Sequence, residues 1–160
     1  MKQFTFTAES EAETMALGAA LAAVLPEGAT VALRGTLGAG KTRLVQAIAA
    51  ALGVDRRGVV SPTFVLVQEY QGRRRICHVD AYRLADQDEF FQLGVDEFFE
   101  SDALVLIEWA ERISKHLPAE RIEVEISIRG RQSRQFDVTA LGLRYAGVLD
   151  RLAAALFLPQ

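Results

Sequence analysis

Hydrophobic and polar residues follow two different periods along this chain, and the boundaries between segments of different period coincide with glycine or proline. Residues 122–128 alternate between apolar and polar side chains, and so do residues 136–140. This period of two is typical of half-buried strands, and Gly130 between them predicts a hairpin. Residues 30–34 and 104–107 are instead almost continuously apolar, which indicates strands buried on both faces.

Helices are predicted where apolar residues recur every three or four positions. In residues 41–52 the large apolar side chains share one helical face, and Gly53 follows as an expected C-terminal cap. The S-x-x-E sequence beginning at Ser10 is typical of a capping box, and we expect its helix to end at about residue 25. Further helices are expected at residues 86–93, 95–99 and 143–156, and further strands at residues 4–7, 64–70 and 75–79.

The order of these elements predicts one α/β domain over residues 1–160. The strands at 64–70 and 75–79 flank a tight turn around Gly72 and are therefore expected to be antiparallel. Together with the strands followed by helices, they predict a mixed parallel and antiparallel sheet with helices packed against it.

Composition narrows the class of protein. The chain has 160 residues, of which 50% are hydrophobic, enough for one ordinary core. A formal net charge of −3 provides no bulk attraction to nucleic acid or to an anionic membrane. The single cysteine, Cys77, excludes an intramolecular disulfide framework and fits a reducing compartment. With no signal-peptide pattern and no apolar run of spanning length, we expect a cytoplasmic protein without membrane contact.

A glycine-rich segment carries the strongest functional signal. Residues 35–42, GTLGAGKT, match the pattern G-x-x-x-x-G-K-[ST] and lie between a predicted strand and a predicted helix. In this context the loop amides and the helix N-terminus can surround phosphates, while Lys41 reaches the terminal phosphates and the Thr42 hydroxyl binds magnesium. The structural alternative is an ordinary glycine-rich turn before a helix.

A candidate acidic residue, Glu108, follows directly after the apolar run 104–107. A buried carboxylate needs a cationic partner, and the strand ending in Glu108 is expected beside the strand that leads into the glycine-rich loop. Glu108 can therefore meet a magnesium ion held by Thr42; the alternative is a solvated strand end. Trp109 either shields the site, faces a partner or belongs to the core.

The sequence HVDAYRL at residues 78–84 offers further candidates. Strand alternation places His78 and Asp80 on the same side. Asp80 either positions the attacking water or binds the metal through a water; the alternative is that Asp80 caps the following turn and His78 is a buried, hydrogen-bonded imidazole. Ser61 and Thr63 either sense the γ-phosphate or belong to a rigid loop entering the next strand.

These motifs, in this order, resemble the TsaE family, also known as YjeE, of bacterial P-loop ATPases. The resemblance extends from GTLGAGKT through SPTFVLVQEY, HVDAYRL and LGVDEFFESDALVLIEWAE to GRQSR at residues 130–134. It implies a P-loop NTPase-like, three-layer α/β/α fold. It also implies a phosphate site at Gly38, Ala39, Gly40, Lys41, Thr42 and Arg43, magnesium on Thr42 and Glu108, and catalytic roles for Asp80, Glu108 and Lys41. Thr63 becomes a site residue as well, Arg134 approaches the nucleotide from the second hairpin, and Ser10 lies near the adenine.

The resemblance also implies a biological setting. The family binds ATP and Mg²⁺ and acts with a TsaD-type threonylcarbamoyl transferase and its TsaB-type paralogue in threonylcarbamoyladenosine synthesis on tRNA, so contact with tRNA would be indirect. ATP hydrolysis would reset the complex between cycles, and the isolated chain would be a monomer. This chain departs from the family pattern at Thr36, where Asp is common, and at Arg43, where Thr or Ser is frequent.

Three other functions are compatible with a phosphate-binding loop. A small-molecule kinase of similar size is the leading enzymatic alternative, although no arginine-rich lid with a proline signature is evident. A GTP switch is disfavoured because the sequence lacks an N-K-x-D segment for reading guanine. A nucleotide-sensing adaptor, in which ATP only orders a partner surface, would place Phe98, Phe99 and Trp109 at an interface.

Overall fold

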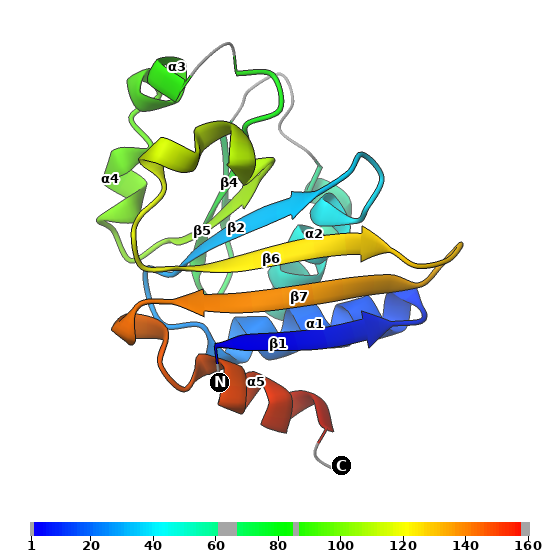
Figure 1. Cartoon of the computed structure of the whole chain (residues 1–160). Helices are drawn as coiled ribbons and strands as arrows, with labels where there is room; N and C mark the ends of the chain where they lie inside the picture. The colour runs from blue at the N-terminus through cyan, green and yellow to red at the C-terminus, as the bar shows by residue number, and fades with distance from the viewer. Residues whose placement is uncertain (1, 61–66, 85–86, 158–160) are drawn as a thin grey trace.

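One mixed sheet organises the molecule (Figure 1). The computed structural model describes residues 2–60, 67–84 and 87–157, and within these ranges seven strands pair in the order β1-β7-β6-β2-β5-β4-β3. The pairs β6–β2, β2–β5 and β5–β4 are parallel, whereas β1–β7, β7–β6 and β4–β3 are antiparallel. The predicted mixed α/β fold is therefore confirmed.

The predicted elements are found with shifts of a few residues at their ends. The strands are β1 (Gln3–Ala8), β2 (Thr30–Gly35), β3 (Val67–Gln71), β4 (Arg75–Asp80), β5 (Leu104–Glu108), β6 (Arg121–Ile128) and β7 (Arg134–Leu141). The α-helices are α1 (Glu11–Val24), α2 (Lys41–Ala51), α3 (Gln87–Gln92), α4 (Asp96–Phe99) and α5 (Val148–Phe157), and the 3-10 helices are η1 (Arg56–Gly58), η2 (Ala110–His116) and η3 (Leu143–Tyr145). Residues 64–66 of the third expected strand lie outside the described residues.

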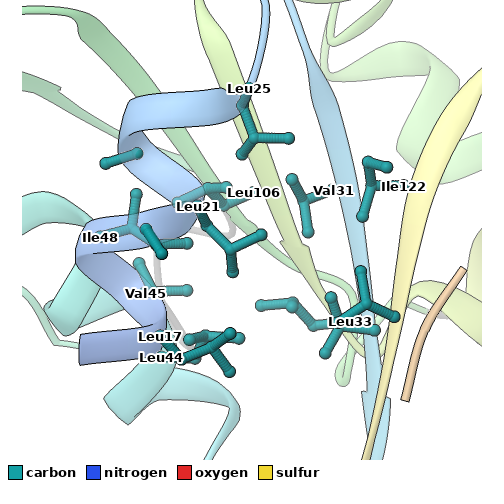
Figure 2. Packing of buried hydrophobic residues seen from close by; sticks show 14 of the residues in the cluster. Leu17, Leu21, Leu25, Val31, Leu33, Leu44, Val45, Ile48, Leu106 and Ile122 are labelled. Carbon is teal, nitrogen blue, oxygen red and sulfur yellow. The ribbon is translucent and has the colours of Figure 1, made fainter. Parts of the chain in front are cut away.

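Strand alternation divides the core between the two faces of the sheet. In β5, Leu104 and Leu106 join the cluster beneath α1, α2 and α5, whereas Val105 and Ile107 join the cluster beneath α3, α4 and η2. Figure 2 shows the first cluster, where leucines of α1 and α2 meet β2 and β5 side chains. Helices thus pack on both faces, which gives the expected three layers.

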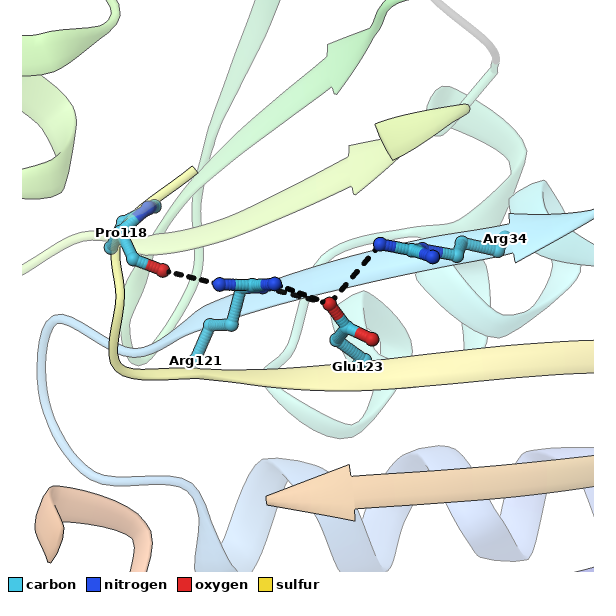
Figure 3. Close-up of polar contacts among 4 residues, drawn as sticks. All are labelled: Arg34, Pro118, Arg121 and Glu123. Atoms are coloured by element: carbon cyan, nitrogen blue, oxygen red, sulfur yellow. Dashed lines mark hydrogen bonds and ion pairs between the residues drawn. The ribbon is translucent and has the colours of Figure 1, made fainter. Parts of the chain in front are cut away.

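On the second face of the sheet, β2 and β6 carry a network of polar side chains (Figure 3). Glu123 Oε1 accepts hydrogen bonds from Arg34 (3.2 Å) and from Arg121 (2.6 Å), and Arg121 also donates to the Pro118 carbonyl oxygen at 2.9 Å. This half-buried network lies on the polar side of β6, opposite the apolar side that enters the core. It explains why β6 alternates while β5 is apolar on both sides.

The end of the chain differs from the expected single helix at residues 143–156. A short 3-10 turn, η3, comes first, and α5 begins only at Val148. Gly147 has a φ of 81°, a left-handed conformation that interrupts a helix. Tyr145 of η3 is buried, and its hydroxyl accepts a hydrogen bond from the Thr30 amide at 3.0 Å, which anchors the start of β2.

The start of α1 agrees with the capping prediction. The Ser10 hydroxyl accepts a hydrogen bond from the Glu13 amide at 3.3 Å, and the Glu13 carboxylate accepts one from the Glu9 amide at 3.0 Å. The helix then runs in contact with α2 behind the sheet (Figure 1). This packing supports the helix whose first turn forms the candidate site.

Candidate active site

The glycine-rich loop connects β2 to α2 at one edge of the sheet. Gly38 and Gly40 have φ values of 79° and 113°, conformations that glycine adopts without strain. A Cβ atom added to either residue would lie more than 4 Å from every neighbouring atom of the described residues, so the backbone there faces open space. The loop thus offers its amides and the N-terminus of α2 to an anionic ligand.

Lys41 is 5% exposed and folds back onto its own loop. Its ammonium group donates hydrogen bonds to the carbonyl oxygens of Gly35 (2.6 Å) and Thr36 (3.0 Å). Burial lowers the pKa of Lys41, and the negative charges of Glu108, Glu111 and Asp80 oppose that shift. Because the Thr36 contact uses the backbone, the departure from the family pattern at this position leaves the Lys41 hydrogen bond intact.

Glu108 lies next to the start of α2, as the sequence predicts. In parallel register Leu33 of β2 pairs with Glu108 of β5, so both strands end at the loop edge. The Thr42 hydroxyl donates a hydrogen bond of 2.7 Å to Glu108 Oε1, and Glu108 is 3% exposed. The strand end is buried, not solvated.

A hydroxyl and a carboxylate oxygen at this distance fit a magnesium site. Magnesium prefers oxygen ligands, and in nucleotide sites it uses one or two protein groups, with phosphates and waters completing the shell. Among the described residues there is no cluster of three or more His, Cys, Asp or Glu side chains that could hold a metal. The Thr42 hydroxyl and the Glu108 carboxylate are two protein groups of the kind that such a magnesium site uses.

Asp80 stands beside Glu108 at the end of the neighbouring strand. The two residues pair in the register of β4 and β5, and Asp80 is 3% exposed. Asp80 Oδ1 accepts a hydrogen bond from the Tyr82 amide at 2.9 Å, so the turn-capping interpretation is correct. Two adjacent carboxylates at this edge favour cationic ligands, and the capping contact also fixes the position of Asp80.

His78 lies on the same side of β4 as Asp80 and is fully buried. Its Nε2 lies 2.5 Å from Glu108 Oε2. The interpretation of His78 as a buried, hydrogen-bonded imidazole is therefore confirmed. Its partner, 30 residues away in the sequence, was not predicted.

Two cavities flank the loop within the described part of the chain. The first has a volume of about 450 Å³ and is lined by Leu37, Gly38, Gly40, Lys41, Thr42, Arg43, Asp80, Tyr82, Arg83, Glu108 and Trp109. The second has a volume of about 400 Å³ and is lined by Glu11, Thr14, Gly38, Gly40, Arg43, Arg131, Gln132, Arg134 and Phe136. Because Gly38, Gly40 and Arg43 line both, a ligand lying across the loop can extend from one cavity into the other.

Arg134 links the β6–β7 hairpin to the loop. Its Nε donates to the Ala39 carbonyl oxygen at 3.1 Å, and its Nη1 donates to the carbonyl oxygens of Gly130 (2.9 Å) and Ser133 (3.0 Å). The structure thus places Arg134 against the loop backbone, and its predicted approach to a nucleotide stays a prediction. Its hydrogen bonds hold the loop backbone against the hairpin.

The remaining predicted residues have more peripheral positions. Arg43 forms an ion pair of 3.0 Å with Glu11, but both side chains are largely exposed, so this pair contributes little stability. Ser10 caps α1. The residues of α1 that line the second cavity, among those described, are Glu11 and Thr14. Sequence reasoning missed these two because no motif marks them. Ser61 and Thr63 lie outside the described residues.

Comparison with known proteins tests the resemblance to the TsaE family. A family model described as threonylcarbamoyl adenosine biosynthesis protein TsaE matches residues 8–136. The chain belongs to the TsaE family. A relative from Bacillus subtilis, named tRNA threonylcarbamoyladenosine biosynthesis protein TsaE, is 38% identical over 154 residues, which cover 96% of each chain.

Two further similarities agree with this TsaE membership. A protein of the same name from Treponema pallidum is 35% identical over 129 residues, covering 81% of this chain and 95% of the relative. The crystal structure of YdiB from Bacillus subtilis superimposes with a TM-score of 0.82 at 34% identity and covers 95% of each chain. In the parts of the chain that the structure describes, no helix combines the length and apolarity needed to cross a membrane.

Proposed function

We propose that this TsaE-family protein is a magnesium-dependent ATPase of tRNA threonylcarbamoyladenosine synthesis. In this role it acts with a TsaD-type transferase and a TsaB-type paralogue, and ATP hydrolysis resets their complex between cycles. Family membership supports the pathway. The observation that supports the chemistry best is the meeting of Lys41, Thr42 and Glu108 at the phosphate-binding loop.

Each group has a role that follows from its position. The loop amides and the positive end of α2 bind the phosphates of ATP, and the Lys41 ammonium moves from its backbone carbonyls to the terminal phosphate oxygens. The Thr42 hydroxyl and Glu108 Oε1 would hold magnesium, and the ion would supply positive charge beside the phosphates. Asp80, fixed by its turn contact, orients the attacking water through a carboxylate oxygen.

Nucleotide binding by the isolated chain tests the phosphate site on which this function depends. Isothermal titration with a non-hydrolysable ATP analogue and magnesium should give one site in the wild type and no detectable binding in Lys41→Ala. Lys115→Ala, which removes a lysine of η2, should bind as the wild type does. Retained affinity in Lys41→Ala would reject the phosphate site, and competition between adenine and guanine nucleotides identifies the base.

A nucleotide-sensing adaptor is the second candidate. The observation that favours it is the Asp80 turn contact, because a carboxylate that caps a turn has a structural role even without hydrolysis. The test is tRNA modification by the reconstituted partner set with wild type or Asp80→Asn. Unchanged modification over many turnovers, with abolished hydrolysis, would establish the adaptor; modification that stops after about one turnover supports the ATPase.

A further inference from the structure

Both oxygens of the Glu108 carboxylate have a separate partner. Oε1 accepts the hydrogen bond from Thr42 at 2.7 Å, and Oε2 lies 2.5 Å from His78 Nε2. His78 and Glu108 are 0% and 3% exposed, so water does not compete for this contact. The orientation of the carboxylate is therefore determined from two sides.

The position of the His78 proton follows from this geometry. An ionised carboxylate only accepts hydrogen bonds, so with Glu108 as a carboxylate Nε2 carries the hydrogen that lies between the two groups. Among the described residues the other ring nitrogen, Nδ1, is buried and has no hydrogen-bond partner. Leaving such an atom unpaired costs free energy that an apolar side chain would avoid. The hydrogen bond to Glu108 offsets this cost of burying the imidazole.

Without His78, Glu108 would have alternative orientations. Its side chain has three rotatable bonds, and the Lys41 ammonium attracts its charge from the same side of the sheet. Asp80, its register neighbour, repels it. A donor at His78 Nε2 holds Oε2 back along β4 and leaves Oε1 directed at Thr42.

We propose that His78 is a positioning residue that presents Glu108 Oε1, together with the Thr42 hydroxyl, to magnesium. His78 touches neither the nucleotide nor the metal and transfers no proton; it acts through the Glu108 carboxylate. This proposal rests on the proposed magnesium-dependent nucleotide binding. Removal of an outer hydrogen-bond partner of a metal ligand typically costs about 10–100-fold in metal affinity, which sets the expected size of the effect.

Three substitutions separate positioning from packing. His78→Leu removes the donor and keeps a large apolar side chain. His78→Gln places an amide donor close to the position of Nε2, whereas the shorter His78→Asn has the same amide but falls short of Oε2. Cys77→Ala is the matched control, because Cys77 is equally buried on β4 but faces the opposite side of the sheet.

The measurement is the magnesium concentration required for half-maximal binding of a non-hydrolysable ATP analogue, with circular dichroism to verify folding. We expect an increase of about 10–100-fold for His78→Leu and His78→Asn, recovery to within about threefold for His78→Gln, and no change for Cys77→Ala. Nucleotide binding in EDTA should be the same in all variants, because the effect requires the metal.

The outcomes distinguish this proposal from the function on which it rests. If the wild type itself shows no magnesium-dependent binding, the proposed function fails. If the wild type binds but His78→Leu has the wild-type magnesium requirement, or if Gln and Asn are impaired equally, the positioning role is rejected. Should His78→Leu fail to fold, the comparison of Gln with Asn alone decides the matter.

Discussion

The Lys41 ammonium lies 3.9 Å from the centroid of the Trp109 ring. Trp109 reaches this place because its backbone is left-handed, with φ and ψ of 58° and 41°, which turns the chain sharply after Glu108. Such a conformation costs a non-glycine residue about 1–2 kcal/mol. A cation–π contact is worth about 0.5–1 kcal/mol at an exposed site and about 2 kcal/mol out of water, so this contact with a half-buried Trp109 offsets much of that cost. Trp109 therefore covers the lysine and belongs to the site.

Nucleotide binding should change the fluorescence of Trp109, the chain's only tryptophan. Lys41 has to leave the indole ring to reach a terminal phosphate, so the surroundings of the ring change. We expect a saturable change in emission on titration with magnesium and an ATP analogue. Lys41→Met should show an altered starting emission and no saturable change. Constant emission at a concentration where calorimetry detects saturation would contradict this account of Lys41.

Arg134 should matter through the loop backbone. Arg134→Ala removes the hydrogen bond to Ala39, and a bond from a charged donor is worth about 1.5–3 kcal/mol. Since the side chain is partly exposed and this bond orders the loop before a nucleotide binds, the lower value sets an upper limit of roughly tenfold on the loss of nucleotide affinity measured by calorimetry. Arg129→Ala is the control, because Arg129 donates to Gln135 within the hairpin. Equal effects of the two substitutions would indicate a general loss of positive charge.

Local rules of the sequence were sufficient for most of the fold. The Ser10 cap, the glycine-rich loop and the alternation of β6 each depend on a few neighbouring residues, and all three are found as expected. The meeting of Thr42 and Glu108 was also predictable, because parallel strands end at a common edge of the sheet.

Contacts between distant side chains were not predictable in the same way. The pairing of His78 with Glu108 depends on strand order and register, which no local pattern encodes. The left-handed turn at Trp109 is unfavourable for that residue type, so propensity points away from it. The second cavity lies between α1 and a hairpin more than 100 residues further along the chain, and Gly147 divides the last predicted helix by a backbone conformation that sequence periodicity does not reveal.

Because of Cys77, the free energy of unfolding should fall as the pH rises into the alkaline range. Burial raises the pKa of its thiol from 9.0 to about 12. Between these values the unfolded chain loses the thiol proton while the folded chain keeps it, so the contribution of Cys77 is complete below pH 9 and declines above it. The expected decline in unfolding free energy is about 1.4 kcal/mol per pH unit.

The measurement is urea unfolding of wild type and Cys77→Ala between pH 8 and 11. Burial also raises the pKa of Tyr70, which adds to the decline, and lowers that of Lys41, which opposes it. Both groups remain in the variant, so the difference between the two slopes isolates the thiol. Parallel stability curves would show that Cys77 ionises equally well in the folded protein.

Gly18 should resist replacement although it lies inside a helix. Alanine in place of glycine normally stabilises a helix by about 1 kcal/mol. At Gly18, however, a Cβ would lie 2.3 Å from the Ala47 Cβ and 2.7 Å from the Ala47 carbonyl carbon. Neither atom can rotate away, and overpacking costs about 1–3 kcal/mol. We therefore expect Gly18→Ala to lower stability in urea unfolding.

The same substitution should weaken nucleotide binding. Ala47 belongs to α2, whose first residues are Lys41 and Thr42, so a shift of α2 away from α1 displaces both groups relative to Glu108. Ala16→Gly is the control: Ala16 is exposed in the interior of α1, so this change should cost about 1 kcal/mol of stability and leave binding unchanged. A gain in stability for Gly18→Ala with unaltered binding would show that α1 and α2 tolerate a wider separation than this packing allows.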